Sequence, residues 1–139
     1  MRVRHLALLL VLLAALGGAA ELPALAQGPN RVALVVQHGD GTVVTRCVEF
    51  DEPSLTGYQI LLRSGLEITA SSGPLGTAIC RIDGEGCDAG NCFCQMPGSY
   101  WSYWNLADGA WQYSPLGASA RQVHNGDVEG WAWGAGSPP

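Results

Sequence analysis

The cysteines are the first residues whose chemistry can be weighed. The sequence has five of them, at Cys47, Cys80, Cys87, Cys92 and Cys94. The last four could supply the four thiolates of a zinc site. Cys92 and Cys94, however, have a single residue between them, whereas zinc ligands are usually separated by about two to four. We therefore expect disulfides and no metal site.

The sequence leaves several disulfide pairings open. We favour Cys47 with Cys80, which would join an early hairpin strand to a later strand. The second bridge would join Cys87 to Cys92 or Cys94 and close a small loop. Each bridge would add about 2 to 4 kcal/mol to the stability by restricting the unfolded chain. One thiol would remain, either free and buried or paired with another chain.

Aromatic side chains are dense in residues 100–104 and return near 111 and 131. On a strand, alternate residues point to opposite faces, so Trp101 and Tyr103 would share one face and Tyr100 and Trp104 the other. About half of these rings would be core, and the rest would form an exposed platform for a flat or apolar ligand. Alternatively, 70–76 and 86–99 fold over that face as loops. The candidate ligand-binding residues are Trp101, Tyr103, Trp104, Trp111, Tyr113, Trp131 and Trp133.

Catalysis has weak support in the sequence. Asp127 and Glu129 are two residues apart and could do acid–base chemistry. The simpler interpretation is that Asp127 belongs to a turn and that Glu129 is a solvated strand residue. There is no nucleophile-elbow motif, and no phosphate-binding glycine loop precedes a helix. We predict a non-catalytic protein with no catalytic residues and no required cofactor.

The N-terminus has the pattern of a secretory signal peptide over residues 1–26. Basic residues precede an unbroken apolar run at 6–16, and small residues follow it. Cleavage sites of the small-x-small type occur at 18–20 and 24–26, and we favour the second. The apolar run is shorter than the roughly 20 residues that span a bilayer, so we expect no stable membrane anchor. We predict a secreted or extracytoplasmic protein, where cysteines oxidise to disulfides.

Charge and length limit the function classes further. The net charge is −5, and the sequence contains no lysine. An acidic chain without a basic patch argues against nucleic acid and anionic membrane surfaces as partners. The length left after cleavage suits one domain, which we place at 27–134, with 135–139 as a disordered tail.

The first half of the domain predicts a hairpin and a helix. The segments 31–37 and 42–50 are β-rich and flank turn residues at 38–41. Helical spacing follows from Pro53, and Gly65 stands where a left-handed C-terminal cap is needed. The stripe expected to be buried consists of Leu55, Tyr58, Leu61 and Leu62.

The second half predicts strands and turns. Short strands are expected at 66–69 and 77–82, with a loop at 70–76. An Asp-Gly pair between the aromatic runs 100–106 and 110–114 is a strong hairpin signal. The remaining strands are expected at 120–123 and 128–133. The fold class is α+β, with one helix packed on a mostly antiparallel, disulfide-linked sheet.

Residues 31–134 resemble the C-terminal β-grasp domain of the vitamin B12 carriers transcobalamin and intrinsic factor. The resemblance rests on "YWSYW" at 100–104, the "GAS" loop at 117–119 and "NGDVEGW" at 125–131. It is strongest to a bacterial, exported, single-domain branch of that group without a settled function. It implies a β-grasp fold.

The resemblance also implies a small-ligand-binding module, with a corrinoid as one candidate ligand. A membrane importer component for micronutrients is the implied partner. His38 and His124 are expected in turns, so we do not assign either to cobalt. The alternative functions are a protein-interaction domain and a carbohydrate-binding domain, each using an exposed aromatic face.

Overall fold

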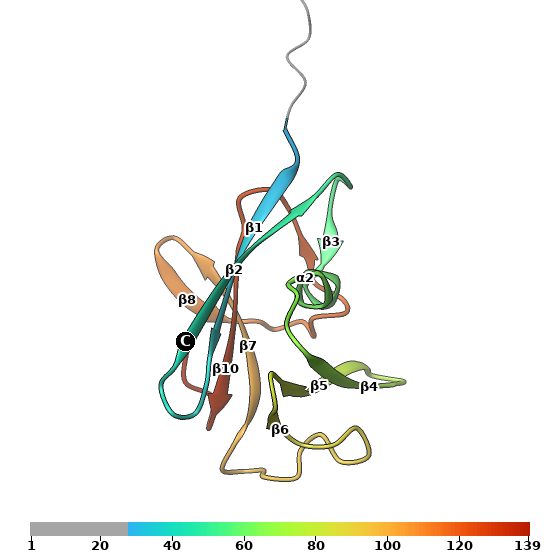
Figure 1. The fold of residues 1–139 in the computed structure, drawn as a ribbon, viewed down its shortest axis with the longest axis vertical. Helices are drawn as coiled ribbons and strands as arrows, with labels where there is room; N and C mark the ends of the chain where they lie inside the picture. Colours follow the sequence, from blue (N-terminus) through green and yellow to red (C-terminus); the bar gives the residue numbers. More distant parts are fainter. Residues whose placement is uncertain (1–27) are drawn as a thin grey trace, which may run out of the picture.

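A twisted five-stranded sheet forms the centre of the computed structural model, which describes residues 28–139 (Figure 1). The strand order is β2-β1-β10-β7-β8. The central pair, β1 and β10, is parallel, and the other neighbours are antiparallel. The strands are β1 (Asn30–Gln37), β2 (Val43–Phe50), β7 (Tyr100–Ala107), β8 (Ala110–Tyr113) and β10 (Val128–Gly134).

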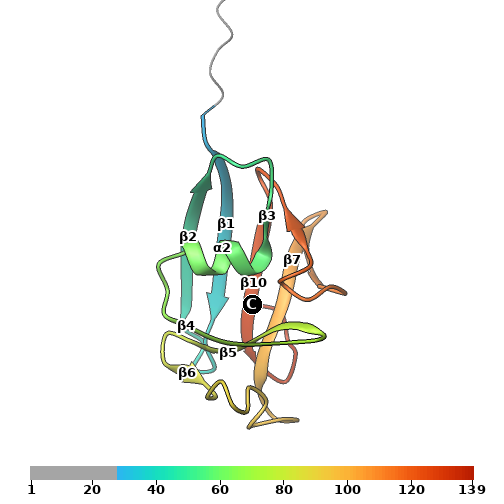
Figure 2. The same cartoon turned by 90° about the vertical axis from the view of Figure 1, so that its right-hand side faces the viewer.

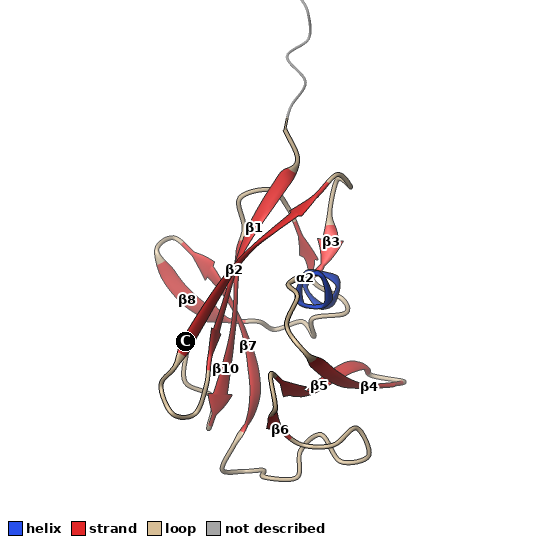
Figure 3. Cartoon of the chain, viewed as in Figure 1, coloured by secondary structure: helices blue, strands red, loops and turns tan. Residues whose placement is uncertain are grey.

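Two smaller sheets and one helix lie on a single side of this sheet (Figure 2). The helix, α2 (Gly57–Arg63), crosses the sheet face, and the β4–β5–β6 sheet lies beside it (Figure 3). These elements are β3 (Leu55–Thr56) with β9 (Gln122–Val123), and β4 (Ile68–Gly73) with β5 (Gly76–Ile82) and β6 (Glu85–Gly86). The mixed architecture agrees with the predicted α+β class.

The helix begins later than its sequence pattern predicted. Thr56 is the N-cap: its hydroxyl accepts from the Gln59 N–H, and the Gln59 side chain accepts from the Thr56 N–H. This capping box is more specific than the Pro53 signal. The predicted stripe is therefore partly wrong, because Leu62 is half exposed and Ile60 is buried instead. Gly65, at φ +78°, confirms the left-handed position after the helix.

Two clusters of apolar side chains lie between the helix and the sheet. One is built on Val32, Phe50, Leu55 and Ile60. The other contains Leu61 together with Trp101 and Tyr103 of β7 and Trp131 of β10. The helix therefore packs on the aromatic strands, so a substitution of those rings would also disturb the packing of the helix.

The turns follow the sequence closely, with one exception. The Asp108-Gly109 pair has positive φ at both residues and joins β7 to β8, as predicted. Residues 70–76 are not a loop, because β4 continues to Gly73 and pairs with β5 across a tight turn. Ala70 and Ser71 pair along that ladder, so they extend the hairpin.

The disulfides correct one predicted bridge. Cys80 is paired with Cys92, and Cys87 with Cys94. Cys87–Cys94 is one of the two predicted alternatives. Cys47 is free and exposed, because it alternates with the buried Val48 and so points to the sheet face opposite the helix. It cannot reach β5, which lies on the helix side.

Replacing both Cys87 and Cys94 by serine is expected to lower the free energy of unfolding by about 2 to 3 kcal/mol. The bridge closes a loop with a sequence separation of 7, so its effect on the unfolded chain is modest. Urea denaturation followed by circular dichroism measures it. Cys47→Ser is the matched control and should change stability by less than about 0.5 kcal/mol. Equal losses in the two variants would contradict the pairing.

The predicted signal peptide and its cleavage site lie outside the described residues. Across residues 28–139, no helix is long and apolar enough to cross a membrane.

Candidate ligand-binding site

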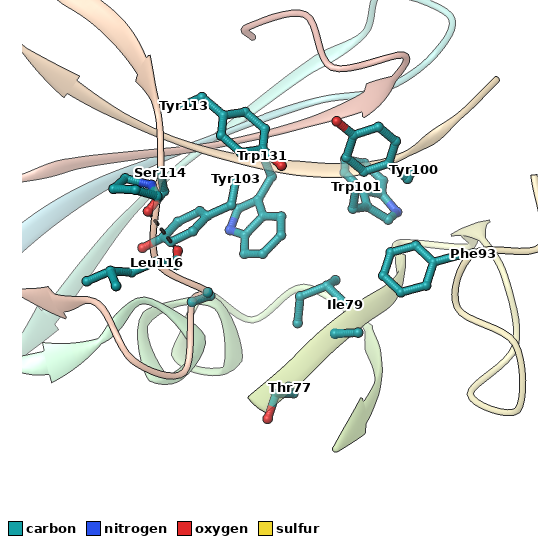
Figure 4. Close-up of a pocket in the computed structure, with 14 residues that line it drawn as sticks. Thr77, Ile79, Phe93, Tyr100, Trp101, Tyr103, Tyr113, Ser114, Leu116 and Trp131 are labelled. Carbon is teal, nitrogen blue, oxygen red and sulfur yellow. Dashed lines mark hydrogen bonds between the residues drawn. The ribbon is translucent and has the colours of Figure 1, made fainter. Parts of the chain in front are cut away.

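An aromatic cleft of about 310 Å³ opens at the side of the sheet that carries the helix (Figure 4). One wall consists of Trp101 and Tyr103 from β7 and Trp131 from β10. The opposite wall is the 77–79 segment of β5, and the loop 114–118 closes one end. We call this space the aromatic cleft.

The rim of the aromatic cleft is exposed and apolar. Phe93, Tyr113 and Leu116 each have an exposed fraction of 53%. Tyr100 and Tyr113 belong by alternation to the opposite sheet face and reach the cleft around the edge of β7. Large apolar groups at this exposure around a concave site are typical of a binding surface.

The aromatic wall is held rigidly. The rings of Tyr103 and Trp131 are stacked, with centroids 4.7 Å apart and an interplanar angle of 21°. The Trp101 indole donates a hydrogen bond of 3.0 Å from Nε1 to the Glu85 carbonyl. All three rings are buried, so the wall is preformed and requires little reordering to receive a ligand.

The loop wall is anchored to the start of the helix. The N–H groups of Gly57 and Tyr58 donate to the carbonyls of Arg121 and Ala118, at 3.1 and 2.9 Å. Helix-terminal N–H groups lack partners within the helix, so this loop and its continuation to Arg121 satisfy two of them. Ser119 Oγ accepts from the Thr77 N–H at 3.1 Å and joins the loop to β5. Helix, loop and β5 therefore fix the cleft together.

Glu129 corrects another prediction, since it is fully buried rather than solvated. It shares its face of β10 with Trp131 and Trp133, which point toward the helix side. Its carboxylate accepts from the Tyr103 hydroxyl and, at 3.2 Å, from Arg121 Nε. The alternation that places both tryptophans on this face places Glu129 there too, and this signal could have revealed its burial.

Burial sets the ionisation of Glu129 and Tyr103. It raises the pKa of the Glu129 carboxyl, and the hydrogen bonds from Tyr103 and Arg121 offset part of that rise. Burial, together with the Glu129 charge, raises the pKa of the Tyr103 hydroxyl, which therefore stays protonated and donates. The hydrogen bond to Glu129 orients the Tyr103 ring toward the cleft.

Four of the seven candidate ligand-binding residues meet in the cleft: Trp101, Tyr103, Tyr113 and Trp131. Trp104 lies on the opposite sheet face, where its indole donates to Ser102 Oγ at 2.8 Å and meets Tyr113 edge-on. Trp111 covers Gly130 on that same face, close enough that a Cβ at Gly130 would lie 2.7 Å from its ring. Trp133 packs on Trp101 at 5.5 Å and lies outside the cleft.

The β4–β5 hairpin and the 87–99 segment cover only part of the aromatic face. Ile79 and Phe93 reach over it, yet the cleft stays open between them and β7. The two interpretations of the aromatics, core and binding face, therefore each hold for part of the set. The pattern missed Ile79, Phe93 and the 114–118 loop, since periodicity does not tell which distant segments meet.

Neither histidine of residues 28–139 lines the cleft, although the His38 ring meets Trp101 edge-on with centroids 5.5 Å apart. His38 follows β1, and its Nδ1 lies 2.7 Å from the Glu85 carboxylate, so it is paired rather than simply solvated. His124 is exposed in the turn before β10, where its N–H donates to Asp127 at 2.9 Å. Among residues 28–139, no group of three or more His, Cys, Asp or Glu could hold a metal ion.

The comparisons with known proteins show the fold alone. No family model and no curated protein matches the chain. A candidate metal binding protein from Ruminococcus gnavus aligns with a TM-score of 0.56 and 22% identity, over 75% of this chain and 95% of that one. Haptocorrin in complex with Cbi aligns with a TM-score of 0.56 and 16% identity over 77% of this chain. The alignment spans 25% of the haptocorrin chain.

Proposed function

We propose that this protein is an exported, non-catalytic module that binds a small molecule in the aromatic cleft, with a corrinoid as the leading ligand class. The observation that carries the proposal is the preformed wall of Trp101, Tyr103 and Trp131 behind an apolar, exposed rim. A stacked aromatic wall suits a flat, largely apolar ligand.

The comparison with haptocorrin supports a corrinoid as the ligand class through the similarity of the folds. The likeness to haptocorrin, whose structure contains Cbi, agrees with a β-grasp-like arrangement of helix and sheet. Two disulfides fit a protein that works outside the reducing cytoplasm. A membrane importer component that receives the ligand is the partner that we propose.

The size of the cleft limits how a corrinoid would enter. At about 310 Å³, it lies at the lower end of the range for ligand pockets. A corrin macrocycle exceeds this volume, so the cleft would take one edge of the ring and its substituents. The rest of the ring would lie against the rim.

Isothermal titration of the purified protein with dicyanocobinamide tests the proposal. We expect saturable binding that weakens about tenfold in each of Phe93→Ala and Leu116→Ala, because both remove apolar rim contacts. Leu62→Ala is the matched control, since Leu62 is 50% exposed on the helix and does not line the cleft. It should leave the affinity unchanged.

Absence of binding at sub-millimolar concentration would overturn the corrinoid proposal. Equal losses in Leu62→Ala and Leu116→Ala would instead overturn the assignment of the site to the cleft. Binding of glycans or of a protein partner, with loss in the rim variants, would favour the alternative of an interaction domain.

A further inference from the structure

The edge of β7 that borders the aromatic cleft offers unpaired backbone groups. β8 pairs only with the Trp104–Ala107 half of β7, and the last bond of that ladder runs from the Ser114 N–H to the Tyr103 carbonyl at 2.9 Å. Pro115, which has no N–H, then leads the chain away. By antiparallel alternation, the N–H and C=O of Trp101 point to the same edge as those of Tyr103. No hydrogen bond to either group of Trp101 occurs along the described part of the chain outside the β10 ladder.

A second unsatisfied donor lies in the aromatic wall. The Trp131 indole is 3% exposed and lines the cleft, and its Nε1 has no acceptor among the described residues. Figure 4 shows this indole between the rings of Tyr103 and Trp101. Nε1 is itself closed to solvent, so a ligand in the cleft would contact the ring of this indole and not its N–H.

The aromatic cleft also lacks charge. None of its lining residues is acidic, basic or a histidine, and the chain as a whole carries a net charge of −5. A carboxylate placed there would lose hydration without gaining a cation. An uncharged group that donates and accepts at once meets no such penalty.

From the open edge at Trp101 and the absence of charge, we infer that the cleft selects an uncharged carboxamide. The amide N–H would donate to the Trp101 carbonyl, and an amide oxygen would accept from the Trp101 N–H. The inference rests on the proposed function and adds the group that is recognised. We assign this group to the amide substituents at the edge of a corrinoid, and a peptide main chain is the other source of the same chemistry.

Three corrinoids of similar shape test the inference on the unmodified protein by isothermal titration. Dicyanocobinamide is rich in carboxamides, the heptamethyl ester of dicyanocobyrinic acid accepts but has no amide N–H, and dicyanocobyrinic acid is anionic. We expect the ester to bind about tenfold more weakly than the amide, because one donated bond is lost. We expect the acid to bind at least about a hundredfold more weakly at neutral pH, because its charges are desolvated without partners.

The outcomes separate this inference from the proposed function. Equal affinities for amide, ester and acid would overturn carboxamide recognition and leave corrinoid binding intact. Binding of N-acetyl-leucine amide in the absence of any corrinoid binding would support carboxamide recognition with a peptide source and overturn the corrinoid assignment. Absence of binding by every one of these compounds would overturn both.

Discussion

Replacing Arg121 by leucine is expected to lower the free energy of unfolding by about 3 kcal/mol at pH 8, because it leaves a buried carboxylate without its cation. Glu129 is fully buried, and Arg121 Nε lies 3.2 Å from its Oε1. Among the described residues, the Tyr103 hydroxyl would then be the one donor left to that carboxylate. A single neutral donor does not compensate a charge that has lost its water.

The loss of stability in Arg121→Leu is expected to depend on pH. The raised pKa of Glu129 determines the direction of this dependence. Burial raises the folded-state pKa of this carboxyl above its ordinary value of 4.5, and removal of Arg121 raises it further. Between the unfolded and folded values, the folded state holds the extra proton, so stability falls as pH rises. Below 4.5 the carboxyl is protonated in both states, and the penalty of a buried charge disappears.

Exposed carboxylates act in a separate pH window. The hydrogen bonds from Arg63 hold the pKa of Glu52 at about 2, so its stabilising effect is lost as pH falls from 4.5 through that value. The difference between Arg121→Leu and the unmodified protein, in urea denaturation at about pH 5 and about pH 8, therefore reports on Glu129. Arg46→Leu is the matched control, because Arg46 is exposed and, within residues 28–139, bonds only the Thr45 carbonyl.

We expect Arg46→Leu to change stability by less than about 0.5 kcal/mol at either pH. A second substitution, Glu129→Gln, should recover much of the loss in Arg121→Leu, because it removes the stranded charge. A loss in Arg121→Leu that is the same at both pH values would contradict the role of the buried carboxylate.

Local patterns predicted the strands of the five-stranded sheet, but not the short strands β3 and β6, because the signals of the longer strands lie within a few residues. Asp108-Gly109 marks its hairpin by the positive φ that this turn requires. Gly65 marks the end of the helix for the same reason. The prediction from Pro53 placed the start of the helix too early, because a first-turn preference is weaker than the capping box formed by Thr56 and Gln59.

The candidate site was predicted in part, because a cleft depends on which segments meet. Alternation alone placed Trp101 and Tyr103 on one face. It gave no way to learn that the 114–118 loop and Ile79 close a cleft over them, since those contacts are far apart in the sequence. The Cys47–Cys80 pairing was wrong for a related reason: the strand containing Cys47 was identified, but the face to which its thiol points was not.

Gly57 reveals how tightly the helix is fitted to the aromatic wall. It is the first residue of α2, where alanine would ordinarily stabilise a helix by up to about 1 kcal/mol. A Cβ at this position would instead collide with the Tyr103 hydroxyl and lie 2.7 Å from Cζ of the same ring. Tyr103 cannot retreat easily, because its ring is stacked on Trp131 and its hydroxyl is bonded to Glu129.

Gly57→Ala is therefore expected to destabilise the fold by about 2 to 3 kcal/mol, as overpacking of a rigid core does. Urea denaturation measures the change. Gly90→Ala is the matched control, because a Cβ at Gly90 meets nothing within 4 Å, and it should stay within about 0.5 kcal/mol of the unmodified protein. A stabilised Gly57→Ala would show that helix propensity governs this position.

The double variant Gly57→Ala with Tyr103→Phe separates the collision from other effects of the methyl group. Removing the hydroxyl relieves the nearest contact, so the two losses should sum to more than the loss in the double variant. The same displacement of Tyr103 should weaken dicyanocobinamide binding in Gly57→Ala, because the ring forms part of the cleft wall. Additive losses of stability together with unchanged binding would contradict this coupling. They would show that the start of the helix and the aromatic cleft are independent, although hydrogen bonds join them.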